Sequence, residues 1–282
     1  HTLRKEPISF YPHKFSKNHF NVVEVKALRD LFTSSAVVES REEVKIKGEA
    51  EAIEAWIDFD KMIEVPSGPF LYGEDQHEEK IEQPFLIDVY PVTNQQFRRF
   101  IEGGGYTHEE FWSEEGIKWK GKWKGDNRII YPQYWNDEKW NKPDHPVVGV
   151  SWYEANAYAK WANKRTPTEM EWEKSARGED GRVYPWGNDF DKEKCNTYES
   201  GIGSTNRVAR YPAGISTIGC YDMAGNVWEW TDSGYNKDQD TRVLRGGALD
   251  SNQSYARCAF RFFDNPNLRY YNIGFRCVRT LK

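Results

Sequence analysis

The sequence predicts a loop-rich α+β domain with two or three helices and a short antiparallel sheet. Two helix starts carry capping boxes, Ser151 with Glu154 and Thr168 with Glu171, which satisfy free backbone N–H groups of the first turn. Short apolar runs bounded by Pro and Gly, such as residues 62–70, are typical of short strands. Long stretches without a helical or strand period separate these elements, which indicates that loops form much of the domain.

Residues 1–58 differ in composition from the rest and are expected to form a small N-terminal extension or subdomain. Within them, residues 20–25 are expected to form a short strand and residues 27–32 a helical turn. Residues 42–55 are rich in charge and are expected to be a helical or extended lead-in. The main domain in this interpretation covers residues 59–282.

The main domain begins with regular elements. A strand, a Pro/Gly turn and a second strand are expected over residues 62–70, and residues 85–90 alternate as a further strand. Thr93 is expected to cap a helix over residues 94–102, which three glycines end. That helix has one apolar face, formed by Phe97, Phe100 and Ile101.

The middle of the chain is expected to be a long loop region followed by two helices. Residues 106–143 mix Trp and Tyr with charges, so they are expected to be loops packed by their own rings. Such a region is either functional or an insertion that covers the core. The helices are expected from residue 152 to about 163 and from 168 to 178, the first of them with Trp152, Ala155, Ala159 and Ala162 toward the core.

Composition limits the classes of function. The chain has 282 residues, a net charge of -5 and 15% aromatic residues, including 12 Trp. Because nucleic-acid binders show a basic face, no nucleic-acid partner is expected. No apolar run is long enough to span a membrane, and no signal peptide is visible. Four cysteines match no zinc spacing, and they are compatible with two disulfides or with free buried thiols: Cys195, Cys220, Cys258 and Cys277.

Residues 242–279 interleave two kinds of residue. Arg and Gly resemble a scaffold, whereas aromatic doublets stand beside Asp, Asn and Ser without a clean period. Rings mixed with small polar residues are typical of a binding surface. Alternation also predicts a half-buried strand that ends at about Phe260, so surface and core roles for these rings are evenly balanced.

Residues 60–279 resemble the formylglycine-generating-enzyme/sulfatase-modifying-factor family, which implies a variant C-type-lectin fold. Six motifs in family order carry the resemblance, at residues 145–152, 164–172, 184–188, 225–231, 245–247 and 273–276. The enzymes of this family use two reactive cysteines shortly after the Arg-Gly-Gly motif, where a thiolate pair serves copper and oxygen chemistry. Residues 248–255 hold no cysteine, and Cys258 and Cys277 match structural cysteines of the family, so oxidase activity is not expected.

The C-terminal segment, about residues 245–276, is similar to the variable region of proteins from diversity-generating retroelements. In those systems template adenines are randomised, largely at Asn codons. The framework residues of such tails are matched at Arg245, Gly246, Gly247, Ala256, Arg257, Ala259, Arg261, Pro266, Arg269, Ile273, Gly274, Phe275 and Arg276.

Thirteen positions between the framework residues are the candidate binding positions. All carry residues that an Asn codon reaches by changes at its first two bases, whereas Gln253 is not reachable and is expected to lie outside the set. The candidate binding positions are Asp250, Ser251, Asn252, Ser254, Tyr255, Phe260, Phe262, Phe263, Asp264, Leu268, Tyr270, Tyr271 and Asn272. Strand alternation makes Phe260 the weakest member, because it would point inward with Cys258.

The resulting expectation is a non-catalytic, monomeric ligand-binding protein whose partner is a protein or a glycan. The resemblance implies display at a bacterial cell surface through a lipid anchor outside this chain. The alternatives are a formylglycine-generating-type oxidase that acts on protein cysteines and a structural pseudoenzyme. No cofactor is expected except calcium, which in the family can be surrounded by oxygens at positions matching Asp222, Gly225, Val227 and Glu229. In the competing interpretation, which is slightly favoured, Glu229 makes an internal hydrogen bond.

Overall fold

Three small sheets organise the protein in a computed structural model that describes residues 57–125, 128–236 and 240–281. The expectations for residues 1–56 lie outside the described residues. The first sheet has the order β1-β4-β9, the second is the hairpin β2-β3, and the third has the order β7-β6-β5-β8. The strands are β1 (Met62–Val65), β2 (Gly68–Tyr72), β3 (His77–Ile81), β4 (Phe85–Asp88), β5 (Trp228–Gly234), β6 (Arg242–Arg245), β7 (Phe262–Asp264), β8 (Ile273–Gly274) and β9 (Val278–Thr280).

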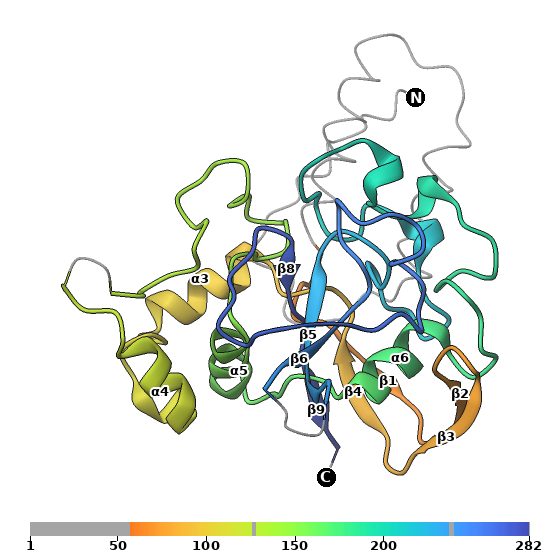
Figure 1. The fold of residues 1–282 in the computed structure, drawn as a ribbon, viewed down its shortest axis with the longest axis horizontal. Coiled ribbons are helices and arrows are strands. Elements are labelled where there is room, and N and C mark those ends of the chain that lie inside the picture. The colour runs from red at the N-terminus through yellow and green to blue at the C-terminus, as the bar shows by residue number, and fades with distance from the viewer. Residues whose placement is uncertain (1–56, 126–127, 237–239, 282) are drawn as a thin grey trace, which may run out of the picture. The chain divides into compact units, whose positions relative to one another are not determined.

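The sheets join distant parts of the chain. β9 pairs antiparallel with β4, so the C-terminal segment closes beside the first strands of the domain (Figure 1). β5 pairs antiparallel with β6 and parallel with β8, and β7 forms an edge of that sheet. Only the parallel β5–β8 pair departs from the expected antiparallel arrangement among the described strands.

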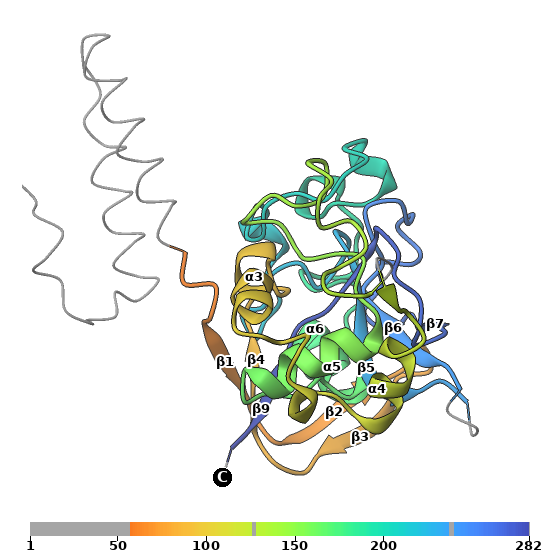
Figure 2. The same cartoon turned by 90° about the vertical axis from the view of Figure 1, so that its left-hand side faces the viewer.

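Four α-helices lie in the described residues: α3 (Asn94–Glu102), α4 (Glu114–Lys120), α5 (Trp152–Trp161) and α6 (Glu169–Arg177). The capping boxes predicted at Ser151 and Thr168 are present, and Thr93 caps α3 in the same way. In Figure 1, α3, α4 and α5 lie on one side of β5 and β6, and α6 lies on the other. Most of the long loop region between α6 and β5 lies at the end of the domain away from the β2–β3 hairpin, in Figure 1 and in the turned view of Figure 2, whereas its start at Gly181 accepts a hydrogen bond from Gln76 of the hairpin.

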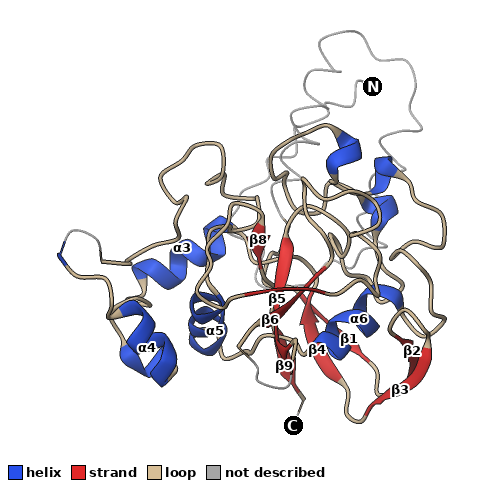
Figure 3. Ribbon diagram, viewed as in Figure 1, coloured by secondary structure: helices blue, strands red, loops and turns tan. Residues whose placement is uncertain are grey.

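Loops make up much of the domain, as predicted (Figure 3). The expectation that residues 106–143 hold no helix is wrong, because α4 and a 3₁₀ turn at Glu109–Phe111 form there. α4 begins at an N-cap, since the Ser113 side chain accepts a hydrogen bond from the backbone N–H of Gly116. The helix has only seven residues, which is too short for a periodic pattern to stand out among the surrounding rings.

The core is built largely from aromatic rings. Phe97 stacks on Tyr158 at a centroid distance of 5.4 Å, and both rings meet Phe275 edge to face. Ala155 and Ala159 are fully buried on α5, as expected, so the helix can approach its neighbours closely. All four cysteines are buried and free, which resolves the open choice between disulfides and thiols.

The strand predicted to end at about Phe260 does not form. The backbone there has other partners: Cys258 N–H donates to the Val183 carbonyl at 2.8 Å, and Arg245 donates to the carbonyls of Ala259 and Phe260. Those groups are therefore not available to a strand ladder. The strand of this segment is β7, which starts at Phe262. No helix within the described residues is long and apolar enough to cross a membrane.

Candidate functional site

Buried arginines fix the C-terminal segment on the domain. Arg245 is fully buried, and its Nη1 donates to the Ala259 and Phe260 carbonyls at 2.9 and 2.8 Å. Its Nη2 donates to the carboxylate of Glu173, which is also fully buried and accepts from Arg177. Charge-assisted bonds of this kind are strong when water is excluded, so they hold the chain around residue 260 without a strand.

Arg276 fixes the other end of the segment. Its Nε and Nη2 donate to the two carboxylate oxygens of Glu229 at 2.7 and 2.8 Å, and both side chains are almost fully buried. The Trp172 indole N–H donates to the same carboxylate at 2.7 Å. Gly274 lies so close to a neighbouring loop that a Cβ there would stand 2.7 Å from the Val147 carbonyl oxygen.

Two further framework arginines hold the loops between these ends. Arg269 pairs with the buried carboxylate of Glu154 at 3.0 Å and also donates to the carbonyls of Gly149 and Tyr131. Arg257 pairs with Glu74 at the surface and donates to the Ser254 carbonyl at 2.9 Å. These four framework arginines are therefore buried, hydrogen-bonded or both.

Most candidate binding positions are on the surface. Exposed side chains occupy eight of the thirteen, namely Asp250, Asn252, Ser254, Tyr255, Phe262, Phe263, Tyr270 and Tyr271. Four are half-buried, namely Phe260, Asp264, Leu268 and Asn272, and Phe260 packs against the main core as strand alternation suggested. Ser251 departs from the expectation because it is buried, with its carbonyl accepting from the Tyr198 N–H.

Six rings form one continuous group, which we call the aromatic surface. The ring of Tyr235 stacks on that of Phe263 at a centroid distance of 4.1 Å. The Phe262 ring lies between Phe263 and Trp228, at centroid distances of 5.9 and 5.3 Å. Trp228 in turn contacts Tyr255 and Phe260. Since Trp228 is 6% exposed, it forms the floor on which the exposed rings rest.

A mixed polar and aromatic group lies at the far end of the segment. The Tyr271 hydroxyl and the Asn272 amide donate to the Asp250 carboxylate at 2.9 and 3.1 Å. The Tyr271 ring lies 5.1 Å from the Trp140 ring. This group adjoins the aromatic surface, because the backbone N–H of Trp228 donates to the backbone carbonyl of Asn272 at 2.8 Å.

The structure adds exposed apolar residues that the sequence did not single out. Among the described residues ten large hydrophobic side chains are exposed, and five of them are candidate binding positions. The other five lie on segments that adjoin the C-terminal segment: Trp123, Ile130, Tyr131, Tyr198 and Tyr235. Tyr235 extends the aromatic surface through its contact with Phe263, and Trp123 and Tyr131 line a pocket described below. Exposed apolar groups of this kind mark interaction sites on proteins. The sequence signal for Trp123, Ile130 and Tyr131 was the unusual ring content of residues 106–143, whereas no pattern singled out Tyr198 and Tyr235.

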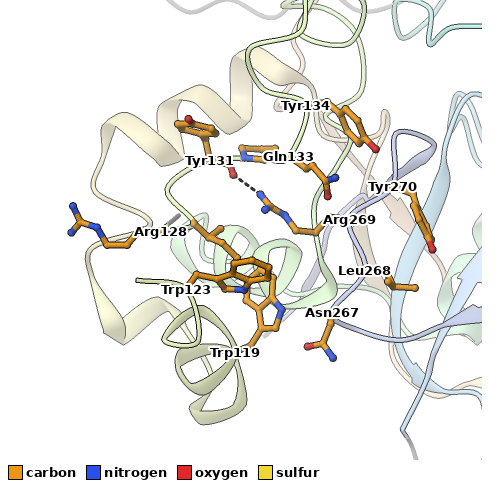
Figure 4. Close-up of a pocket in the computed structure, with 12 residues that line it drawn as sticks. Trp119, Trp123, Arg128, Tyr131, Gln133, Tyr134, Asn267, Leu268, Arg269 and Tyr270 are labelled. Atoms are coloured by element: carbon orange, nitrogen blue, oxygen red, sulfur yellow. Dashed lines mark hydrogen bonds between the residues drawn. The ribbon is translucent and has the colours of Figure 1, made fainter. Parts of the chain in front are cut away.

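A pocket of about 480 Å³ opens where residues 119–134 meet the loop at residues 267–270 (Figure 4). Trp119 and Trp123 lie on one side of it, and Leu268 and Tyr270 lie on the other. The Arg269 guanidinium bridges the two sides through its hydrogen bond to the Tyr131 carbonyl. Among the candidate binding positions, Leu268 and Tyr270 therefore take part in a concave site.

The cysteines are unsuited to thiolate chemistry. Burial raises the pKa of Cys195 and Cys258 to about 12 and that of Cys220 to about 11. Burial also raises the pKa of Cys277 well above its usual range. The thiolate is the nucleophile and metal ligand, so these four side chains are protonated and inert near neutral pH.

The positions considered for calcium have other partners. Both Glu229 oxygens accept from Arg276, and one also accepts from Trp172. Asp222 accepts from the Ala209 N–H at 3.2 Å, and burial raises its pKa to about 6. In the part of the chain that the structure describes, no three His, Cys, Asp or Glu side chains gather as metal ligands. Arg276 bonds both oxygens of Glu229, so that carboxylate would have to leave its partner to bind calcium, and an ion held by Asp222, Gly225, Val227 and Glu229 stays a prediction.

Comparisons with curated proteins relate the chain to proteins of several names. It is 34% identical to the serine/threonine-protein kinase pkn1 of Chlamydia caviae over 94% of this chain, but it spans only 44% of that protein. It is 34% identical to the inactive C-alpha-formylglycine-generating enzyme 2 of Bos taurus, over 77% of this chain and 87% of that protein. It is 36% identical to the hercynine oxygenase of Mycobacterium tuberculosis, over 68% of this chain and 52% of that protein.

Solved structures support the predicted fold. PvdO from Pseudomonas aeruginosa matches with a TM-score of 0.60 and 22% identity, over 78% of this chain and 94% of that one. Treponema denticola variable protein 1 matches with a TM-score of 0.56 and 18% identity, over 78% of this chain and 95% of that one. The fold is thus the C-type-lectin-like fold of the formylglycine-generating-enzyme type. A family profile for the sulfatase-modifying factor enzyme 1-like domain matches residues 49–281, and the chain belongs to that family.

Proposed function

We propose that the chain is a non-catalytic binding protein that presents a sequence-diversified surface to a ligand. The observation that carries this proposal is the division within one segment between exposed candidate binding positions and buried framework residues. Eight of the thirteen candidate positions are exposed, whereas Arg245, Gly274 and Arg276 are buried. Substitution at the exposed positions leaves the buried ion pairs intact, so the surface can vary while the fold stays the same.

The aromatic surface is suited to binding. Its rings already contact one another and rest on the nearly buried Trp228, so they lose little freedom when a ligand arrives. Tyr and Phe supply contact area, and the neighbouring Asp, Asn and Ser side chains supply adaptable hydrogen bonds. This combination allows different ligands to be bound by different sets of residues at the same positions.

Enzyme activity is the competing interpretation, because one relative is named as an oxygenase and another as an inactive enzyme. The cysteine chemistry of a formylglycine-generating-type oxidase needs thiolates at an accessible site. Burial raises the pKa of all four cysteines here, and residues 248–255 contain none. These observations favour the inactive relative as the functional analogue.

The partner and the place of action extend the same proposal. The ligand would be a protein or a glycan, bound by a monomer at a bacterial cell surface. The resemblance to variable proteins of diversity-generating retroelements supports display through a lipid anchor beyond this chain. No nucleic acid is expected as a partner of the aromatic surface, since the chain carries a net charge of -5.

Two displayed libraries test the proposal. One randomises the eight exposed candidate positions with Asn-derived codons, and the matched library randomises eight buried framework residues in the same way. Protease resistance should survive in most members of the first library and in few of the second. Selection of the first library against unrelated proteins and glycans should then yield binders. Equal loss of resistance in both libraries, or no binder to any target, would contradict the proposal.

A further inference from the structure

The pocket beside Trp119 is formed mainly by residues that lie outside the diversified segment. Eight of its twelve lining residues belong to residues 119–134, and the other four belong to residues 267–270. Its volume of about 480 Å³ lies within the range of about 300–1,000 Å³ that is usual for small-molecule sites. A fixed site of this size is able to bind a small chemical group whatever residues occupy the aromatic surface.

Cationic and aromatic residues alternate in the segment that supplies Trp119 and Trp123 to the pocket, although the lysines of this segment are not among the described lining residues. Residues 118–124 contain four lysines and two tryptophans without an acidic residue, although the whole chain has a net charge of -5. Lys118, Lys122 and Lys124 are exposed, and none of them forms an ion pair with a described residue. The segment beside the pocket therefore carries positive charge that is not neutralised by the described chain, and this charge attracts anions.

Among the described residues the lining has donors and rings but no carboxylate. Trp119, Trp123 and Tyr131 present rings, Gln133 and Asn267 present amides, and Arg128 adds a further exposed cation. Trp119 is 5% exposed, and its indole N–H has no acceptor among the described residues, as is also the case for Trp140 and Trp228. Its nitrogen is not among the fully buried polar atoms that lack a partner, so it reaches solvent at the pocket. A ligand oxygen can therefore replace water at this donor.

We infer that this pocket is a fixed subsite for an anionic saccharide, a sugar ring that carries a carboxylate or a phosphate. The apolar face of such a ring would stack on the Trp123 indole, and its hydroxyls would bond the amides and the Trp119 N–H. Its charged group would lie toward the exposed lysines beside Trp119 and Trp123, since the Arg128 side chain extends away from the pocket (Figure 4). The inference goes beyond the diversified surface, because the groups it uses on residues 119–134 do not vary with that surface.

Other occupants fit the same observations less well. An extended peptide binds by adding a strand, but no lining residue lies in a strand, so the walls offer no strand edge. A long nucleic acid would extend over the remainder of a chain with net negative charge. A membrane surface needs a protruding apolar face and makes no use of a concave site with free donors. A short anionic sugar requires only the local positive charge.

Titration calorimetry with the whole chain tests the inference. The probes are an oligogalacturonate and mannose 6-phosphate, with the uncharged galactose oligomer and mannose as matched neutral sugars. At least one anionic sugar should bind about tenfold more tightly than its neutral match, a factor that corresponds to about 1.4 kcal/mol. Trp123→Ala should weaken that binding by about tenfold, and Lys122→Gln should weaken it several-fold at low salt.

Control variants remove the same groups elsewhere. Tyr198→Ala removes an exposed ring, and Lys160→Gln removes an exposed cation, neither of which lines the pocket, so both should leave affinity within about twofold. Unchanged binding in Trp123→Ala, no binding of either anionic sugar, or tighter binding of a single-stranded oligonucleotide, a poly-glutamate peptide or anionic vesicles would overturn the inference. Sugar binding that persists when the aromatic surface is randomised would separate this site from the proposed diversified one.

Discussion

The structure predicts three levels of destabilisation for substitutions in the C-terminal segment, measured as the change in the free energy of unfolding. Tyr270 is 46% exposed and has no ring partner among the described residues, so Tyr270→Ser should change the free energy of unfolding by about 0.5 kcal/mol or less. Phe263 is 42% exposed but stacks on Tyr235 at 4.1 Å. Loss of a stacked pair costs about 0.5–1.5 kcal/mol beyond area burial, so Phe263→Ser should cost roughly 1–2 kcal/mol.

Arg276→Met should be far more costly. It leaves the Glu229 carboxylate, which is almost fully buried, without the cation that bonds both of its oxygens. Breaking one side of a buried pair costs about 3–5 kcal/mol. The resemblance alone would also place Arg257 in this group. Its pair with Glu74 is partly exposed, however, and surface pairs contribute about 0–1 kcal/mol, so Arg257→Ala should be mild.

Equilibrium denaturation with urea measures these differences directly, and thermal melts give a second readout. For a domain of this size, about 1 kcal/mol shifts the melting temperature by roughly 2–4 °C. Tyr270→Ser should therefore lie within about 2 °C of the parent, and Arg276→Met should lie roughly 6–20 °C below it. If the Tyr270 variant unfolds as readily as the Arg276 variant, the division into surface and framework is refuted.

Three further predictions concern chemistry and pH. Incubation of the chain with copper and a cysteine-containing sulfatase peptide should yield no formylglycine by mass spectrometry, because burial raises the pKa of all four thiols; any conversion would support the oxidase alternative. Calcium or a chelator should leave the melting temperature unchanged, because Arg276 occupies both Glu229 oxygens; a calcium-dependent rise would show that the site rearranges to bind the ion. Burial lowers the pKa of His145, so the unfolded chain takes up a proton below about pH 6.5 while the folded chain resists it. Stability should thus fall as pH drops below that value, and His145→Gln should reduce this slope; an identical slope in the variant would show that other groups cause it.

Local chemistry explains which parts of the fold were predictable. The capping boxes at Ser151 and Thr168 use side chains three residues apart, so the sequence alone specifies them. The strand wrongly predicted to end at about Phe260 depends instead on a residue far away in the sequence. Its residues alternate as a strand requires, but Arg245, 14 and 15 residues earlier, donates hydrogen bonds to two of its carbonyls. A single-sequence pattern contains no information about such a distant partner.

The exposure of most candidate binding positions was predictable from the sequence, whereas the shape of the surface around them was not. The resemblance marked which positions of residues 250–272 would vary, and eight of them are exposed. It did not predict that Trp228, from β5, would form the floor, or that residues 119–134 would complete a pocket. Those relations depend on loops that meet only in the folded chain.

The same arginines explain how an irregular segment can tolerate change. A regular strand would hold residues 250–272 by its own ladder, and side chains on its inner face would then be fixed by the core. Arg245, Arg269 and Arg276 instead bind carbonyls or buried carboxylates at separate points, and the exposed positions between these points need no particular side chain. Anchoring through side chains of the framework therefore leaves the intervening positions free to carry rings or small polar groups. Removal of one anchor should disorder its own loop first, since each arginine fixes a different stretch of backbone.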